Sequence, residues 1–149
     1  MQQKRLPLGI ERRLYKTKFK TVIMVTSHSK KEKYSTEISN GITAILSDAT
    51  SKDGGKGEQF RPHELLCAAL ASCLNITARM VLDRKELKYD DVIVKVDLDR
   101  SDENKTKFVY HVDIIGDIDE ATKNKVIHML RGCPVKKTLE KEISVEAAE

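Results

Sequence analysis

The sequence contains no tryptophan, and only 5% of its residues are aromatic, so it offers few rings on which nucleic-acid bases could stack. Its net charge of +4 comes largely from a basic N-terminal stretch. That stretch is a candidate nucleic-acid or membrane-surface arm, but no aromatic platform or known binding motif accompanies the charge. We therefore expect no nucleic-acid partner and no membrane, and interpret residues 1–20 as a solvated lead-in to one domain over residues 1–149.

Cysteine is also scarce, with three residues and no C-x-x-C spacing. This argues against a disulfide framework and against a four-ligand zinc site. The histidines are scattered singly over different segments and predict no metal site: His28, His63, His111 and His128. No nucleophile motif of the Gly-x-Ser-x-Gly type occurs. No charged-then-apolar signal segment with a cleavage site opens the chain, so we expect a cytoplasmic protein.

The longest apolar stretch predicts one helix from Pro62 to Lys85. Pro62 suits a first helical position, and Glu64 places negative charge at the positive end of the helix dipole. Apolar residues occur on more than one face, so we expect burial on nearly all sides. Polar residues interrupt the run and argue against a membrane span: Ser72, Asn75, Thr77 and Arg79. At about 36 Å in length, the helix needs cover from a sheet, other helices or a partner subunit.

Before this helix, a strand is predicted at Thr21–Thr26, followed by a hairpin of Tyr34–Ser39 and Ile42–Ser47. Between the last two, Asn40-Gly41 suits a two-residue type I′ turn. Residues 48–59 are rich in glycine and polar residues and predict a mobile loop. A phosphate-binding loop is the alternative, but the stretch lacks the Gly-Lys-Ser/Thr ending of such loops.

After the helix, alternating apolar residues at 92–98 and 108–114 predict a second hairpin with one polar face. Asp119–Arg131 has an amphipathic helical pattern, and Gly132 is placed for a left-handed C-terminal cap. A short helix should follow, with Cys133 at its N-cap, and a last strand at Ile143–Val145. Hairpins with segregated helices predict an α+β fold.

The three cysteines differ in their predicted surroundings. Cys73 lies in the middle of the long helix, so it is either a small core residue or a thiol activated by a neighbour in the fold. Cys133 begins a helix with two lysines in the next turn, which should favour its thiolate. Cys67 lies about 120° around the helix from Cys73, so their side chains cannot meet, and we expect it to pack in the core.

Two motifs carry a resemblance to a known family. The run P-H-E-L-L-C-A-A-L-A-S-C ends at Cys73, and G-C-P-V follows about sixty residues later with Cys133. With the α+β order of elements, this frame resembles the OsmC/Ohr family of thiol-dependent hydroperoxide reductases over roughly Thr21 to Val145.

The resemblance implies an intertwined homodimer with antiparallel sheets and two long central helices packed together. It also implies that Cys73 is the peroxidatic cysteine and Cys133 the resolving one, acting on a small hydroperoxide, with an external dithiol as reductant and no metal or flavin. In the family's peroxidases a glutamate follows the motif proline, and an N-terminal arginine activates the thiolate. Here His63 follows the proline and Glu64 comes one later, while Arg61 or Lys30 could supply the positive charge.

Two other functions stay open at the level of sequence. The chain could be a redox sensor or a sulfur carrier that uses Cys133 alone, because a cysteine before proline at a helix start also suits a persulfide carrier. It could also be a ligand-binding dimer whose cysteines are inert.

Overall fold

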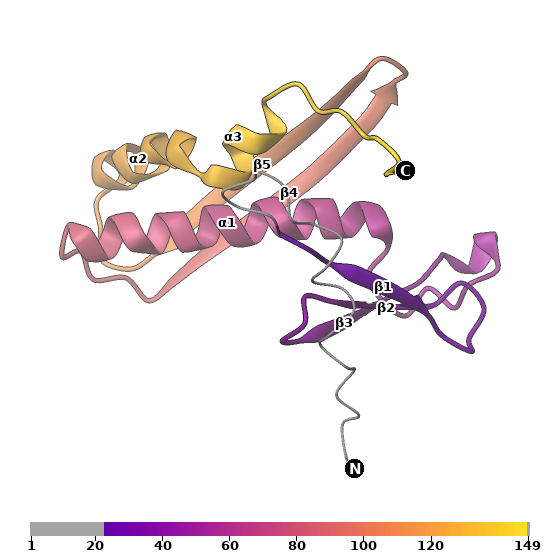
Figure 1. Ribbon diagram of the computed structural model, residues 1–149. Helices are drawn as coiled ribbons and strands as arrows, with labels where there is room; N and C mark the ends of the chain where they lie inside the picture. Colours follow the sequence, from indigo (N-terminus) through magenta and orange to yellow (C-terminus); the bar gives the residue numbers. More distant parts are fainter. Residues whose placement is uncertain (1–22, 149) are drawn as a thin grey trace, which may run out of the picture.

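The computed structural model describes residues 23–148. A single long helix, α1 (Pro62–Arg84), runs across the molecule, and all other elements lie along it or beyond its ends (Figure 1). The strands are β1 (Thr26–Ser29), β2 (Thr36–Ser39), β3 (Ala44–Ser47), β4 (Asp91–Asp102) and β5 (Lys105–Ile115). The later helices are α2 (Glu120–Met129) and α3 (Pro134–Leu139). The predicted α+β fold with antiparallel sheets and a long central helix is confirmed.

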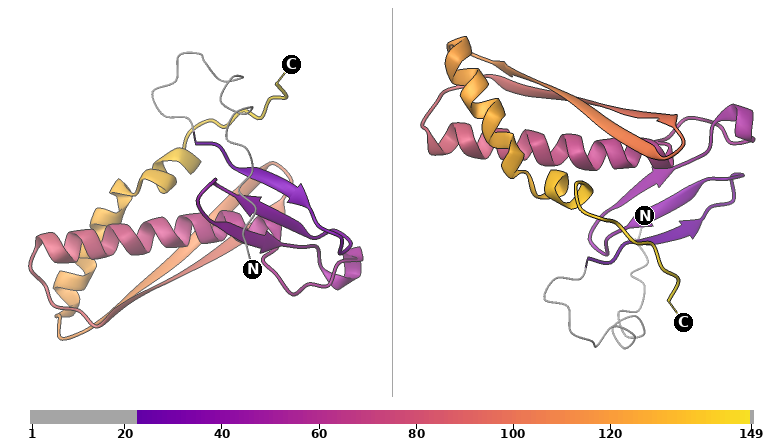
Figure 2. Two further views of the ribbon diagram at one scale, coloured as in Figure 1. Left: turned by 60° about the horizontal axis from the view of Figure 1, so that its bottom comes forward. Right: turned by 90° about the horizontal axis from the view of Figure 1, so that it is seen from above.

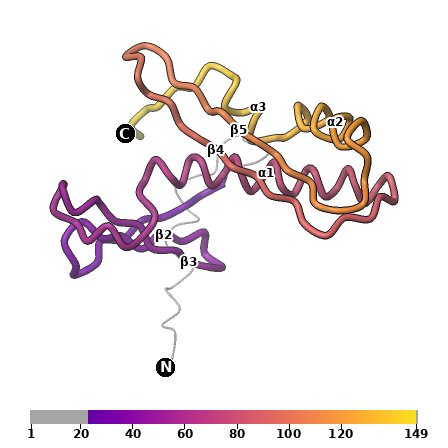
Figure 3. The backbone as a smooth tube through the Cα atoms, turned by 180° about the vertical axis from the view of Figure 1, so that it is seen from behind, coloured from indigo at the N-terminus to yellow at the C-terminus, as the bar shows by residue number. Residues whose placement is uncertain are grey.

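The antiparallel hairpin β4–β5 packs against α1, as the views from above and from behind show (Figures 2 and 3). Its strands alternate as predicted, with Val92, Val112 and Ile114 buried on the face toward the helix. Four α1 residues spaced four apart meet them: Leu70, Leu74, Ala78 and Leu82. Val126, Leu130 and Cys133 complete this core from the other side. The core thus lies between α1, the hairpin and the C-terminal helices.

The short sheet of β1, β2 and β3 lies beyond the N-terminal end of α1 (Figures 1 and 3). Two predictions about it are wrong. Within the described part of the expected Thr21–Thr26 strand, residues 23–25 are irregular and the strand begins at Thr26. The turn between β2 and β3 spans four residues, because Ser39 pairs with Ala44 and the Asn40 side chain accepts the Ile42 and Thr43 N–H groups. Gly41 has a positive φ, as predicted, but Asn40 does not, which excludes a type I′ turn.

The sequence predicted that the glycine-rich loop between β3 and α1 is mobile. In the structure, hydrogen bonds fix this loop. The carboxylate of Asp48, which is 6% exposed, accepts the N–H groups of Glu58 and Gln59 at 3.0 and 3.2 Å. Gly55 packs on the carbonyl of Ala49 with no room for a Cβ atom. The loop therefore delivers the chain to the start of α1 along a defined path.

The C-terminal elements follow the prediction up to α3. Asp119 caps α2 through the Thr122 N–H, and Cys133 is the N-cap residue of α3, with Pro134 next. Gly132, however, ends a short 3₁₀ turn from Leu130 without a left-handed conformation. The predicted strand at Ile143–Val145 is also wrong: this segment has no regular structure, and Val145 is 94% exposed.

Within one chain, helix α1 is buried along one stripe only, and the predicted burial on nearly all sides would need the cover of a partner subunit. Its other faces expose Leu66, Ile76 and Met80. By length and composition α1 could also cross a membrane, because an 18-residue window within it has a mean hydropathy of 1.8. One such helix is weak evidence, because the core helix of a soluble protein has the same properties. Uncovered apolar surface of this kind is typical of an interaction site.

Candidate active site

The fold brings Cys73 and Cys133 together although they lie 60 positions apart. Cys73 is in the middle of α1, and Cys133 is held at the junction of the 3₁₀ turn and α3, which packs on α1 (Figure 1). The Cys133 thiol donates to the Cys73 sulfur with Sγ–Sγ at 2.9 Å. A disulfide bond measures about 2.05 Å, so both cysteines are free thiols.

The two thiols differ in accessibility. Cys133 is fully buried within the core, whereas Cys73 is only partly buried at its edge. Cys73 is therefore the more accessible of the two residues to a small molecule from solvent. The pair therefore consists of the more accessible Cys73 and the buried Cys133, whose sulfur contacts that of Cys73.

Burial raises the pKa of the Cys133 thiol, and its hydrogen bond to Cys73 raises the pKa further. The N–H groups of Lys136 and Val135, at the start of α3, act in the opposite direction but do not outweigh these effects. The sequence predicted that the helix start would lower the pKa of Cys133. This prediction is wrong, because the net effect of the surroundings is to raise that pKa. At neutral pH Cys133 keeps its proton, which it directs at Cys73.

Arg61 and Glu64 form a capping box at the start of α1. The Glu64 carboxylate accepts one hydrogen bond from the backbone N–H of Arg61, at 2.9 Å, and another from the Arg61 Nε–H, at 2.8 Å. It also forms an ion pair with the Arg61 guanidinium. The hydrogen bond to Arg61 holds the pKa of Glu64 below its usual value, and the same bond raises the pKa of Arg61. Glu64 lies nine positions, or about 13 Å along the axis, from Cys73. Within one chain, neither residue is brought to the cysteine pair.

A cavity of about 660 Å³ adjoins the capping box. It is lined by residues of the glycine-rich loop, the first turns of α1 and the outer half of β4, including His63, Cys67 and Arg100. Arg100 Nη1 lies 3.0 Å from His63 Nε2, a contact that sequence reasoning missed because no local signal links residues 37 positions apart. Cys67 is half-buried at this cavity, which corrects the expectation that it packs in the core.

Metal chemistry finds no support in the described part of the chain. Residues 23–148 contain no group of three or more His, Cys, Asp or Glu side chains that could hold a metal ion. Lys30, the other candidate for an activating positive charge, pairs with Glu37 across the β1–β2 sheet at 3.4 Å.

The fold and the paired cysteines define a class of α+β proteins in which a long helix carries one thiol and a short helix presents a second. The model of the OsmC-like protein family matches residues 55–148, and the chain belongs to this family. No curated protein matches the sequence significantly.

Solved structures resemble the fold at low sequence identity. An OsmC-like protein from Mycoplasma pneumoniae is 21% identical, with a TM-score of 0.68, over 82% of this chain and 89% of that one. An organic hydroperoxide resistance protein from Legionella pneumophila is 20% identical, with a TM-score of 0.59, over 83% and 92%. The organic hydroperoxide resistance protein OhrB of Bacillus subtilis is 18% identical, with a TM-score of 0.57, over 80% and 91%.

Proposed function

We propose that this protein reduces organic hydroperoxides with Cys73 as the attacking thiol and Cys133 as the resolving thiol. The observation that carries the proposal is the contact between Cys73, a partly buried residue, and the fully buried Cys133, with Sγ–Sγ at 2.9 Å. Membership of the OsmC-like family supports it, as does the description of two similar folds as organic hydroperoxide resistance proteins.

In the first step the Cys73 thiolate attacks the terminal oxygen of the hydroperoxide and breaks the O–O bond. The leaving alkoxide takes a proton from solvent water and departs as an alcohol, and Cys73 is oxidised by two electrons to a sulfenic acid. The Cys133 thiol donates a hydrogen bond to the sulfur that attacks.

In the second step the Cys133 sulfur attacks the sulfenic sulfur of Cys73. The S–O bond breaks, the leaving hydroxide takes the Cys133 proton to form water, and a Cys73–Cys133 disulfide results. An external dithiol then reduces the disulfide by thiol–disulfide exchange and is itself oxidised. No metal or flavin takes part in this cycle.

The burial of Cys133 argues against the alternative of a sulfur carrier. A persulfide carrier must pass its terminal sulfur to another molecule, yet Cys133 is fully covered. A ligand-binding protein with inert cysteines would have no use for the close thiol contact.

Thiol counting distinguishes the proposed function from these alternatives: reduced protein should consume one equivalent of organic hydroperoxide per chain and lose two thiols. Peroxide left unconsumed over many minutes would overturn the proposal.

We also expect a homodimer, because α1 leaves Leu66, Ile76 and Met80 exposed in one chain. Obligate dimers bury large apolar surfaces, about 2,000 Å² or more in total. Light scattering at micromolar concentration should return twice the chain mass of 16.9 kDa.

Met80→Glu should weaken the dimer because it places a charge on the exposed apolar face of α1. Lys52→Glu, on the exposed loop, is the matched control. A monomeric wild-type protein would contradict this prediction.

A further inference from the structure

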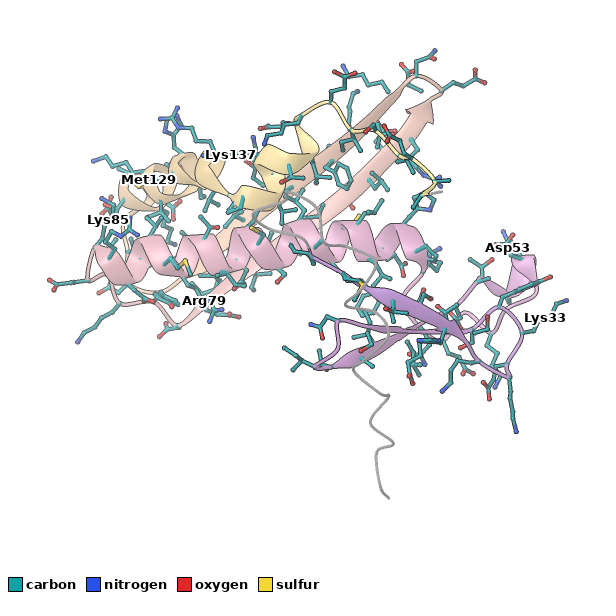
Figure 4. The ribbon with its side chains drawn as sticks, viewed as in Figure 1. Lys33, Asp53, Arg79, Lys85, Met129 and Lys137 are labelled. Atoms are coloured by element: carbon teal, nitrogen blue, oxygen red, sulfur yellow. The ribbon has the colours of Figure 1, made fainter. Side chains whose placement is uncertain are left out.

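The cavity at the start of α1 lies apart from the thiol pair. Its volume is about 660 Å³, and it is bounded by the glycine-rich loop, the first turns of α1 and the outer half of β4. Asp53, labelled in Figure 4, marks its loop side. Cys67, which lines the cavity, lies about 9 Å along the axis of α1 from Cys73 and on a different face of the helix. The proposed peroxide chemistry makes no use of this space.

Two residue patterns that build the core continue past it to this cavity. On α1, His63 and Cys67 are four positions apart and extend the buried stripe that includes Leu70, so they share one face of the helix. On β4, Arg100 follows the alternating, helix-facing series that includes Leu98. The two patterns meet where Arg100 Nη1 lies 3.0 Å from His63 Nε2. Polar and reactive side chains thus take the places at the cavity that apolar side chains hold in the core.

Arg100 has hydrogen-bond donors to spare. A guanidinium only donates, so His63 Nε2 is the acceptor in their contact. Among the described residues, no carboxylate forms an ion pair with Arg100. His63 therefore fixes the guanidinium without neutralising its charge, and the arginine is exposed, so a ligand can reach it. A guanidinium held in this way suits a carboxylate, which it binds through two parallel hydrogen bonds.

The acidic residues at the cavity are already engaged or face outward. Asp48 accepts hydrogen bonds from the loop backbone, and Glu64 is paired within the capping box. Asp53 accepts a hydrogen bond from the Thr50 hydroxyl at 2.6 Å. Asp97 occupies an outward-facing position of β4 and is exposed. These contacts partly offset the negative charge of the lining, whereas the charge of Arg100 has no such partner in the described part of the chain.

Cys67 supplies a nucleophile at the wall of the same cavity. It is a free thiol and only partly buried. Cys73 lies about 120° around the helix and is out of its reach within one chain. A group that Cys67 acquires through its sulfur is therefore retained, because no second thiol of the same helix can displace it.

We propose that this cavity binds a small disulfide that carries a carboxylate, with Arg100 as the binding residue, and that Cys67 exchanges with it to form a mixed disulfide. The Cys67 sulfur attacks one sulfur of the ligand, and the S–S bond of the ligand breaks. A bond forms between Cys67 and one half of the ligand. The other half leaves as a thiolate and takes the proton that Cys67 has lost. The ligand is the oxidant, and this reaction is independent of peroxide reduction.

The test uses the full chain in a Cys73→Ser, Cys133→Ser background, in which Cys67 is the remaining thiol. Oxidised glutathione is the anionic probe, the disulfide of mercaptoethanol is the neutral one, and mass spectrometry follows the mixed disulfide. Arg100→Gln should lower the second-order rate with the anionic probe about tenfold, as expected for the loss of charge-assisted hydrogen bonds. It should leave the rate with the neutral probe unchanged, which separates ligand binding from the reactivity of the thiol.

Arg79→Gln is the matched control, because it removes the same group from an exposed position of α1 well beyond the cavity (Figure 4). It should leave both rates unchanged, and thermal unfolding checks that each variant is folded. Peptide mapping of the Cys67 adduct in chains that keep the other two cysteines repeats the comparison without the serine background. An equal ratio of anionic to neutral rates in Arg100→Gln and Arg79→Gln would overturn the inference. So would a folded parent protein whose Cys67 oxidised glutathione leaves unmodified.

Discussion

Replacing Cys73 with serine should lower the rate of hydroperoxide reduction by about a thousandfold or more, because the reaction loses the thiol of the more accessible residue in the pair. Serine differs from cysteine by one atom, and the site is only partly buried, so the variant should fold. The measurement is consumption of an organic hydroperoxide under single-turnover conditions, with thermal unfolding recorded for each variant.

Cys67→Ser is the matched control for this substitution. It removes a thiol from the same helix, six positions earlier, at the cavity near the start of α1. Because Cys67 lines a cavity rather than the core, the variant should keep the wild-type rate of peroxide consumption. A folded Cys67→Ser protein that loses as much activity as Cys73→Ser would show that the nucleophile has been assigned to the wrong residue.

Replacing Cys133 with alanine should change the fate of the oxidised enzyme rather than its first step. Without a second thiol, the Cys73 sulfenic acid cannot close to a disulfide, so the variant should lose one thiol per equivalent of peroxide where the wild type loses two. Excess peroxide should then convert Cys73 to the sulfinic acid and inactivate it irreversibly. Mass spectrometry after dimedone trapping measures both species.

The Cys133 prediction has its own internal check. Cys133 is fully buried, so the alanine leaves a small cavity, and Cys133→Ser supplies a second variant of nearly the same volume. Both should accumulate the sulfenic acid. Recovery of a Cys67–Cys73 disulfide within one chain in either variant would mean that Cys67 can resolve Cys73, which the arrangement of the two on α1 argues against.

Local chemistry made much of the fold predictable. Pro62 and Asp119 mark helix starts through the requirements of the first turn. The alternation of Val92 and Val94 with exposed neighbours gave the long hairpin. The predictions that were wrong concerned features that depend on contacts with distant parts of the chain. Residues 143–145 have the composition of a strand but meet no partner strand in the single chain.

Part of the candidate site could likewise be predicted from local sequence, and part depended on contacts between distant residues. The position of Cys133 before Pro134 is visible in the sequence, and so are the N–H groups that favour its thiolate. The burial that reverses the net effect on its pKa comes from the packing of α1 and α2, which no local pattern reports. The contact between Cys73 and Cys133 was expected only from the family resemblance, since spacing alone cannot pair two residues so far apart. Activation of Cys73 by Arg61 or Glu64 stays a prediction, as does a cytoplasmic location.

The most direct test of the thiol-pair mechanism is the identity of the bond that one equivalent of organic hydroperoxide produces. Peptide mapping by mass spectrometry under non-reducing conditions should recover a Cys73–Cys133 disulfide and a free Cys67. With mixed isotope-labelled chains, the bond should join residues of the same chain, because the two sulfurs already lie 2.9 Å apart within it. A bridge that contains Cys67, or Cys73 and Cys133 both recovered as free thiols after the peroxide has been consumed, would contradict the mechanism.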